Sequence, residues 1–316
     1  MQTLPTQNSG FFEIARESSD ISFEELSERY LTPEIPVIIE GVGKEWHARE
    51  CWNEHYLHEK LSQEPSASTA SLWYWMNRDS LTEDYTTPDF VNQSLDSPLV
   101  FPRTQHLRLW INKKGHVSSW HYDGSLVNVF NVQVKGKKEW VLVSPHTPLD
   151  CYPYTNFAII KGDDDKMLNG KVFTRFVINE GDILYIPPVW FHKVVACDVE
   201  NINLNWLFTK KETTATSATL KREVERYIIN DYLKNHRFKL VRTMLKQFNR
   251  YAPGYVKISW RYQELIKTPY SISKTDLAKH IAKEAILLGK TLWHLNKVKA
   301  YTKTLSKPRK IQKSLP

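Results

Sequence analysis

Short segments with alternating apolar and polar positions fill the middle of the chain, from about residue 71 to residue 208. Turn signals such as NKKG, KGKK and NEGD separate them, with no intervening βαβ helices. The segments are rich in β-branched and aromatic residues: SLWYWM, HLRLWI, VSSWHYD, NVFNVQV, EWVLVSP, VFTRFVI, DILYIP and INLNWLF. This pattern predicts an all-β sandwich or barrel rather than a series of βαβ units.

Helical periods flank this β region on both sides. Residues 22–30 and 46–61 have the pattern of short helices, and the apolar run at residues 36–42 has the pattern of a buried strand. Beyond the β region the period is helical again, and its apolar positions form one stripe surrounded by lysines. That stripe consists of Leu277, Ile281, Ala285, Leu288, Leu292 and Leu295. We therefore expect a mainly β domain at residues 1–209 and a basic helical region at residues 210–316.

The composition fits a globular protein of a reducing compartment. Hydrophobic residues make up 41% of the 316 residues, which is enough to bury at least one full core. Cys51, Cys151 and Cys197 are odd in number, widely spaced and without a C-x-x-C motif, so they predict neither a disulfide framework nor a zinc ribbon. No stretch reaches the roughly 18 to 20 apolar residues of a membrane span, and the N-terminus lacks a signal-peptide pattern. We expect a soluble, cytoplasmic protein.

Charge divides the chain into two unequal parts. Residues 1–209 contain 18 Lys and Arg and 28 Asp and Glu, a net charge of −10, whereas residues 210–316 contain 25 and 7, a net charge of +18. A basic region with an apolar stripe can form a dimer interface, bind the phosphate backbone of RNA, or lie on an anionic membrane. No RNA-binding motif accompanies the charge, and aromatic membrane anchors are sparse apart from Trp293.

Two metal-ligand residue types stand at the head of a long β-like run, in WHYDGSLVNVFNVQVKGKKEWVLVSP. Alternate residues of a strand point to one face, so His121 and Asp123 can direct an imidazole nitrogen and a carboxylate oxygen at a common point. A third ligand can come from NEGDILYIPPVWFHKVV, where His192 follows a two-proline break. Two histidines and one carboxylate on one face leave three coordination positions open, the usual ligand set of non-haem Fe(II) oxygenases. Zinc, which prefers a closed tetrahedron, is the second choice.

Five segments together resemble the cupin-like JmjC family of Fe(II)- and 2-oxoglutarate-dependent oxygenases, which has protein-directed and tRNA-directed members. They are IPVIIEGV followed by Trp46, HYD at residues 121–123, QVKGKKEWVLVSP at 133–145, GDILYIPPVWFH at 181–192 and NINLNWLF at 201–208. The segments follow the family's order and span about residues 30–210. The resemblance implies a double-stranded β-helix (jelly-roll, cupin) core. It also implies that His121, Asp123 and His192 hold Fe(II) and form the catalytic centre.

The same resemblance implies residues for the cosubstrate 2-oxoglutarate. Lys138, in KGKKEW, matches a lysine that neutralises the C5 carboxylate, and a buried anion needs such a cation. Ser118 matches a hydroxyl residue that contacts the same carboxylate, although strict strand alternation favours Ser119 unless the strand is bulged. Asn205 matches an asparagine near the C1 carboxylate. Asn128 is a looser match, because the segment leading to the QVKG strand is about two residues longer than in the relatives.

Ordinary structural roles stay open for several of these residues. Lys138 can be a solvated hairpin lysine, and Asn205 can satisfy backbone groups at a strand end. Large aromatic side chains usually fill small barrels, so most tryptophans of the β region are expected in the barrel core. These are Trp73, Trp75, Trp110, Trp120, Trp140, Trp190 and Trp206. Trp75 or Tyr74 can instead line a substrate cleft.

Taken with the resemblance, the complete triad predicts an enzyme that hydroxylates an unactivated C–H bond with Fe(II), O2 and 2-oxoglutarate, and releases succinate and CO2. A protein or peptide side chain is the favoured substrate. The alternatives are the same chemistry on a modified tRNA base or a small metabolite, and a cupin that binds metal without turnover. Demethylation is chemically possible, but no histone-reader module or zinc cluster accompanies it. As in relatives, we expect the C-terminal helices to form a homodimer.

Overall fold

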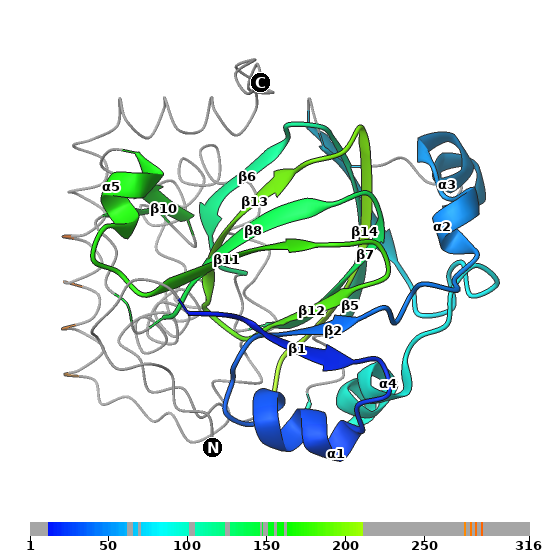
Figure 1. Cartoon of the computed structure of the whole chain (residues 1–316), viewed down its shortest axis with the longest axis horizontal. Coiled ribbons are helices and arrows are strands. Elements are labelled where there is room, and N and C mark those ends of the chain that lie inside the picture. Colours follow the sequence, from blue (N-terminus) through cyan, green and yellow to red (C-terminus); the bar gives the residue numbers. More distant parts are fainter. Residues whose placement is uncertain are drawn as a thin grey trace.

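The described part of the chain forms two β-sheets with short helices around them (Figure 1). The structure is a computed structural model. It describes residues 12–61, 71–100, 105–123, 127–145, 147 and 163–210, the backbone of residues 66–68, 151–154 and 157–160, and the single residues 275, 279, 282 and 286.

The larger sheet has eight strands in the order β1-β2-β12-β7-β14-β5-β4-β3. Their bounds in this order are Ala15–Ser18, Val37–Glu40, Ile183–Ile186, Asn128–Lys135, Glu200–Phe208, His106–Lys113, Ser71–Met76 and Ser66–Ser68. β1 and β2 are parallel, and the other neighbours are antiparallel.

The smaller sheet has six antiparallel strands in the order β11-β8-β13-β6-β10-β9. Their bounds in this order are Phe173–Ile178, Lys138–Val143, Phe191–Ala196, Val117–His121, Phe157–Ile160 and Cys151–Tyr154. From β5 to β8, and again from β11 to β14, successive strands alternate between the two sheets. The expectation of a mainly β fold is therefore confirmed.

Short helices cover the outer sides of the sheets. They are α1 (Phe23–Leu26), the π-helix η1 (Ser27–Leu31), α2 (Ala48–Cys51), α3 (Glu54–Leu61), α4 (Asp89–Asp96) and α5 (Asp164–Leu168). α1 starts at a capping box, in which the side chains of Ser22 and Glu25 each accept a hydrogen bond from the other's backbone N–H. Figure 1 shows α1 to α4 beside the larger sheet and α5 beside the smaller one.

Two hydrophobic clusters lie on opposite faces of the larger sheet. The outer cluster joins helix residues such as Leu57 to sheet residues such as Phe130. The inner cluster, between the sheets, joins Leu142 of β8 to Val129 and Leu207 of the larger sheet. Neighbouring residues of a strand point to opposite faces, which is why Val129 and Phe130 belong to different clusters.

The tryptophans divide between these environments rather than filling one barrel core. Trp140 and Trp190 lie between the sheets, as expected. Trp206 packs in the outer cluster of the larger sheet, and Trp120 packs in a third cluster with Met167 of α5. The expectation of a barrel core therefore holds for Trp140 and Trp190 but not for Trp120 and Trp206, because helices on the outer faces provide further apolar layers.

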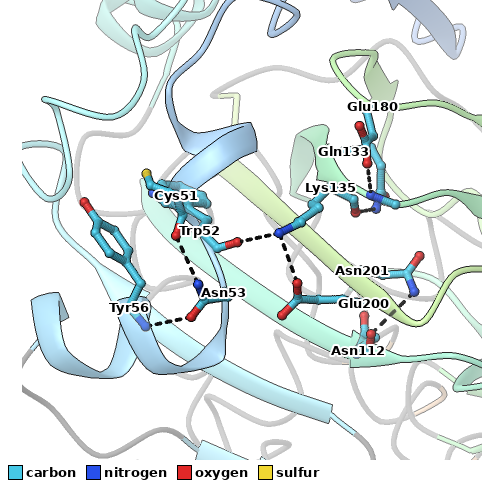
Figure 2. A network of polar contacts seen from close by, with 11 residues as sticks. Cys51, Trp52, Asn53, Tyr56, Asn112, Gln133, Lys135, Glu180, Glu200 and Asn201 are labelled. Carbon is cyan, nitrogen blue, oxygen red and sulfur yellow. Dashed lines mark hydrogen bonds and ion pairs between the residues drawn. The ribbon is translucent and has the colours of Figure 1, made fainter.

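A tight turn joins β7 to β8 and sets the start of β8, where Lys138 lies. Gly136 has a φ of +73°, and a Cβ at this position would overlap the carbonyl oxygen of Glu200. The Gly136 N–H donates to Glu180 Oε1 at 2.6 Å. Figure 2 shows Lys135 beside this turn, with its Nζ 3.1 Å from Trp52 O and 3.2 Å from Glu200 Oε2. Only glycine can occupy position 136 without strain.

The predicted helical region at residues 210–316 lies almost wholly outside the described residues. Thr275, Lys279, Ala282 and Ile286 are helical and exposed, but none of them belongs to the predicted apolar stripe. The domain boundary and the homodimer through the C-terminal helices therefore remain predictions. Within the described ranges, no helix has the length and apolar character needed to cross a membrane.

Candidate metal centre and cosubstrate site

The structure brings His121, Asp123 and His192 together where β6 ends and β13 begins. The two strands are antiparallel neighbours, and His121 lies opposite His192 in their register. One donor atom of each side chain lies within 4.8 Å of the other two. The two imidazole centroids are 4.2 Å apart, and His192 Nε2 is 4.0 Å from Asp123 Oδ2. The three side chains thus offer two nitrogens and a carboxylate oxygen to one point.

Backbone carbonyl groups fix the orientation of both imidazoles. His121 Nδ1 is 2.6 Å from Ser119 O, and His192 Nδ1 is 3.0 Å from Trp190 O. A carbonyl oxygen can only accept, so each Nδ1 carries the hydrogen and each Nε2 keeps its lone pair. This is the arrangement by which metal-binding histidines are oriented in proteins.

The cluster is buried at one end and open at the other. The His192 side chain is 3% exposed, whereas that of Asp123 is 31% exposed. Burial, with a smaller contribution from His121, lowers the pKa of His192 to about 4. The His192 ring is therefore neutral at neutral pH, the state in which an imidazole binds a metal. Ligands can reach the cluster from the Asp123 side.

A β-bulge in β6 decides which serine faces this cluster. His121 pairs with His192, but Ser118 pairs with Val194, so β6 has one extra residue between the two pairs. Residues directly opposite each other in an antiparallel pair point to the same face. Val194 lies in the inner cluster, and Ser118 therefore shares the inner face with His121. The bulge favours Ser118 over Ser119.

Lys138 is a buried cation on the inner face of β8. It is 5% exposed, and its Nζ donates to Asn112 Oδ1 at 2.6 Å and to Asn203 Oδ1. Burial lowers the pKa of Lys138 to about 7. In the described part of the chain no carboxylate forms an ion pair with it. Lys138 is thus not a solvated hairpin lysine, and an anion bound beside it would stabilise its charge.

Amide side chains lie beside this lysine on the inner face of the larger sheet. Asn205 Oδ1 accepts from Nδ2 of Asn131 at 2.6 Å and from Nδ2 of Asn203 at 2.8 Å. Because its oxygen is engaged, Asn205 can offer its Nδ2 group to a carboxylate. Sequence reasoning missed Asn112, Asn131 and Asn203. They alternate with apolar residues on their strands, and this two-residue period is the signal that could have found them.

Asn128 lies on the other face of the larger sheet, away from the metal cluster. Its Oδ1 accepts from the Tyr185 hydroxyl at 2.7 Å, and Tyr185 belongs to the outer cluster. This placement argues against the expectation that Asn128 contacts the cosubstrate. A shift of one residue along a strand turns a side chain to the opposite face. Asn131, three residues later, lies on the inner face beside Asn205.

Arg108 lies in the middle of an aromatic stripe on β4 and β5. Its guanidinium carbon is 4.1 Å from the ring centroid of Trp75, and 5.3 Å from those of Trp73 and Trp110. Cation–π contacts of this kind hold a guanidinium group in one place. In the strand register Arg108 lies opposite Asn205, so the stripe continues the row of amides across the inner face.

Trp75 forms the exposed end of this stripe. It is 41% exposed, and its ring centroid is 5.4 Å from that of His106. It also lines a pocket of about 430 Å³ together with Lys60 and Ser80. Tyr74, by contrast, is buried in the outer cluster. Of the two residues considered for a substrate cleft, Trp75 is the one that lies beside a pocket.

The comparison with known families agrees with the class of protein that this fold and cluster indicate. Residues 66–214 match the family model of the cupin-like domain. Curated relatives include several JmjC proteins. The resemblance to cupin-like JmjC proteins, inferred from the sequence motifs, is therefore confirmed.

Three curated relatives illustrate this similarity. The chain is 27% identical over 166 residues to Jumonji C domain-containing protein 5 of Drosophila melanogaster, covering 48% of this chain and 40% of that protein. It is 21% identical over 257 residues to the bifunctional arginine demethylase and lysyl-hydroxylase psr-1 of Caenorhabditis elegans, covering 62% and 64%. It is 26% identical over 188 residues to tRNA wybutosine-synthesizing protein 5 of Mus musculus, covering 57% and 55%. The chain thus spans about half the length of the curated relatives it matches.

Proposed function

We propose that the protein is an Fe(II)- and 2-oxoglutarate-dependent oxygenase that hydroxylates a C–H bond of a protein or peptide side chain. The observation that supports this most is the cluster of His121, Asp123 and His192, whose donor atoms lie within 4.8 Å of one another. Two imidazoles and one carboxylate leave three coordination positions open, as an oxygenase requires. A closed zinc site needs four ligands, and among the described residues this cluster offers three.

Iron held by this cluster would couple O2 activation to the oxidative decarboxylation of 2-oxoglutarate to succinate. His121 and His192 would keep Nε2 directed at the metal, because carbonyl groups hold each Nδ1–H. Asp123 would supply the anionic ligand on the side that is open to solvent. In this proposal the two sheets are the halves of a double-stranded β-helix, and their apolar inner cluster limits the access of water.

The polar side chains beside the cluster would hold the cosubstrate. Lys138 would neutralise the C5 carboxylate, which replaces the neutral amide oxygens as its partner. Ser118 would donate its hydroxyl hydrogen to the same carboxylate from β6, which is separated from β8 by β13 in the smaller sheet. Asn205 would donate from Nδ2 to the C1 carboxylate. This arrangement matches a dianionic ligand with a buried cation and two neutral donors.

A protein substrate is favoured because psr-1 is named both an arginine demethylase and a lysyl-hydroxylase. Removal of an N-methyl group begins with hydroxylation of its carbon, so both activities use the same C–H chemistry. The identity of the product would distinguish them, since demethylation releases formaldehyde and hydroxylation leaves one added oxygen atom on the substrate.

The direct test is to incubate the iron-loaded chain with 2-oxoglutarate, O2 and a peptide library, and to measure succinate and product masses. We expect succinate together with a product that is heavier by one oxygen atom, and neither in a matched Asp123→Ala sample. Failure of the wild-type chain to bind 2-oxoglutarate when loaded with iron would overturn the proposal. It would leave the metal-binding cupin without turnover as the better interpretation.

A modified tRNA base is the second candidate substrate, and the aromatic stripe favours it. Tryptophan rings next to an arginine are the surfaces on which bases stack in single-stranded nucleic acids. Trp75→Ala should weaken tRNA binding by about 1 to 3 kcal/mol if a base stacks there. Val199→Ala, which truncates another exposed apolar side chain, is the matched control. Equal tRNA binding by wild type and Trp75→Ala would argue against this candidate.

A further inference from the structure

A second group of metal-ligand side chains lies on the outer side of the larger sheet. His47, Cys51 and Asp84 each have a donor atom within 4.8 Å of the other two. His47 is the N-cap of α2 and Cys51 is its last residue, so they are four positions apart and share one helix face. Asp84 comes from the segment between β4 and α4. The backbone ties this segment to α2, since Ala48 N donates to Asp84 O at 2.8 Å.

Asp84 is a buried anion with only neutral hydrogen-bond donors around it. Its Oδ2 accepts from Trp52 Nε1 at 2.8 Å, and its Oδ1 accepts from the Tyr56 hydroxyl at 2.9 Å. No Lys or Arg within the described ranges forms an ion pair with it. The Tyr56 hydroxyl is also 3.0 Å from Oδ2, and a carboxylate offers about four lone-pair sites, so a position remains for a cation. Carboxylates that bind metals are commonly held by such outer donors.

The segment that carries Cys51 is fixed in place. Asn53 Nδ2 donates to Cys51 O at 3.3 Å, and Lys135 Nζ donates to Trp52 O at 3.1 Å. Figure 2 shows the sulfur of Cys51 and the phenol of Tyr56 pointing to the same side, away from Lys135. The Cys51 thiol also shares hydrogen bonds with Tyr56 and Asp84, so these side chains form one connected group.

We propose that His47, Cys51 and Asp84 form a zinc site that joins α2 to the segment before α4. An imidazole nitrogen, a thiolate and a carboxylate oxygen are ligands of Zn²⁺ in proteins, and a water completes the tetrahedron. Binding releases the thiol proton to solvent. Mg²⁺ and Ca²⁺ take oxygen ligands and do not fit this set. The site is independent of the proposed oxygenase, because its residues lie outside the strands that carry His121 and His192.

The test uses Co²⁺ as a probe of the whole 316-residue chain. A thiolate bound to Co²⁺ gives a charge-transfer band in the near ultraviolet, and the His121 cluster contains no sulfur. We expect the band in wild type, in Asp123→Ala, and in the double variant Cys151→Ser with Cys197→Ser, which keeps only Cys51. We expect its loss in Cys51→Ser. In Asp84→Asn and His47→Ala, Co²⁺ binding followed by this band should be at least about tenfold weaker.

Two outcomes would overturn the zinc site. One is the absence of the band in wild type, and the other is a band of equal strength in Cys51→Ser. His47 is largely exposed, so His47→Ala tests the ligand set without risk to the core. Zinc titration gives a second readout in the Asp123→Ala background, where the His121 cluster lacks a ligand: zinc should raise the melting temperature of Asp123→Ala but not of the double variant Asp123→Ala with Cys51→Ser. Equal zinc affinity in both would mean adventitious binding only.

Discussion

The two candidate metal clusters contain similar residue types but differ in the charge that surrounds them. The His121 cluster lies on neighbouring strands and on the same face of the smaller sheet as Lys138, a buried cation without a carboxylate partner among the described residues. The His47 cluster lies on a helix and a loop. It contains Asp84, a buried anion held by neutral donors. A buried charge favours a ligand of opposite sign. The inner region therefore suits a metal together with an anionic cosubstrate, whereas the outer region suits a cation alone.

The largest expected effect would separate the two clusters. Asp123→Ala should weaken Fe(II) binding by more than about 100-fold and abolish succinate formation, because it removes the anionic ligand of the His121 cluster. Cys51→Ser should leave both unchanged and abolish the cobalt–thiolate band. Anaerobic titration with Fe(II) and a succinate assay measure the first variant against the second. A single variant that loses both succinate formation and the cobalt–thiolate band would show that the clusters are not independent.

The second prediction concerns the cation of the inner region. Lys138→Met keeps the length of the side chain and removes its charge, so it should raise the KM for 2-oxoglutarate on the order of 100-fold, with a smaller effect on kcat. Lys137→Ala is the matched control, because Lys137 is the exposed neighbour in the same hairpin. Steady-state kinetics with varied 2-oxoglutarate distinguish the two. An unchanged KM in Lys138→Met would move the anion site elsewhere.

The third prediction follows from the lowered pKa of Lys138. Between about 7, its value in the folded protein, and 10.5, its ordinary value, the unfolded chain binds a proton that the folded chain lacks. The free energy of unfolding should therefore rise with pH across this window, by at most about 1.4 kcal/mol per pH unit, and fall as pH drops towards 7.

Urea unfolding of wild type and Lys138→Met at several pH values measures this difference. The variant should lack the rise. Saturating 2-oxoglutarate with the metal should flatten the wild-type curve, because a bound carboxylate favours the charged lysine. Parallel curves for the two proteins would contradict the burial of an unpaired cation.

The smallest expected effect distinguishes two adjacent serines. Ser118→Ala should weaken 2-oxoglutarate binding about fivefold, since a net hydrogen bond contributes roughly 1 kcal/mol. Ser119→Ala should change it little, because the bulge in β6 turns Ser118 towards the inner face. Calorimetric titration of both variants compares them directly. A larger effect in Ser119→Ala would mean that the strand follows strict alternation in solution.

Local patterns in the sequence were sufficient for features that depend on neighbours along the chain. The two-residue period predicted the β-rich body and the common direction of His121 and Asp123. The motif match added His192 and Lys138, which the structure brings to the same side of the smaller sheet. Periodicity is informative in these cases because strand geometry repeats every two residues, whatever the rest of the fold does.

Tertiary structure alone decided the features that depend on pairing between distant strands or segments. A bulge opposite β13 places Ser118, rather than Ser119, on the inner face, and the register of β7 turns Asn128 outwards and Asn131 inwards. The His47 cluster forms because a loop folds back onto α2 and carries Asp84 close to His47. No local pattern encodes these contacts, since each results from long-range packing that can shift a strand by one residue and reverse every side chain on it.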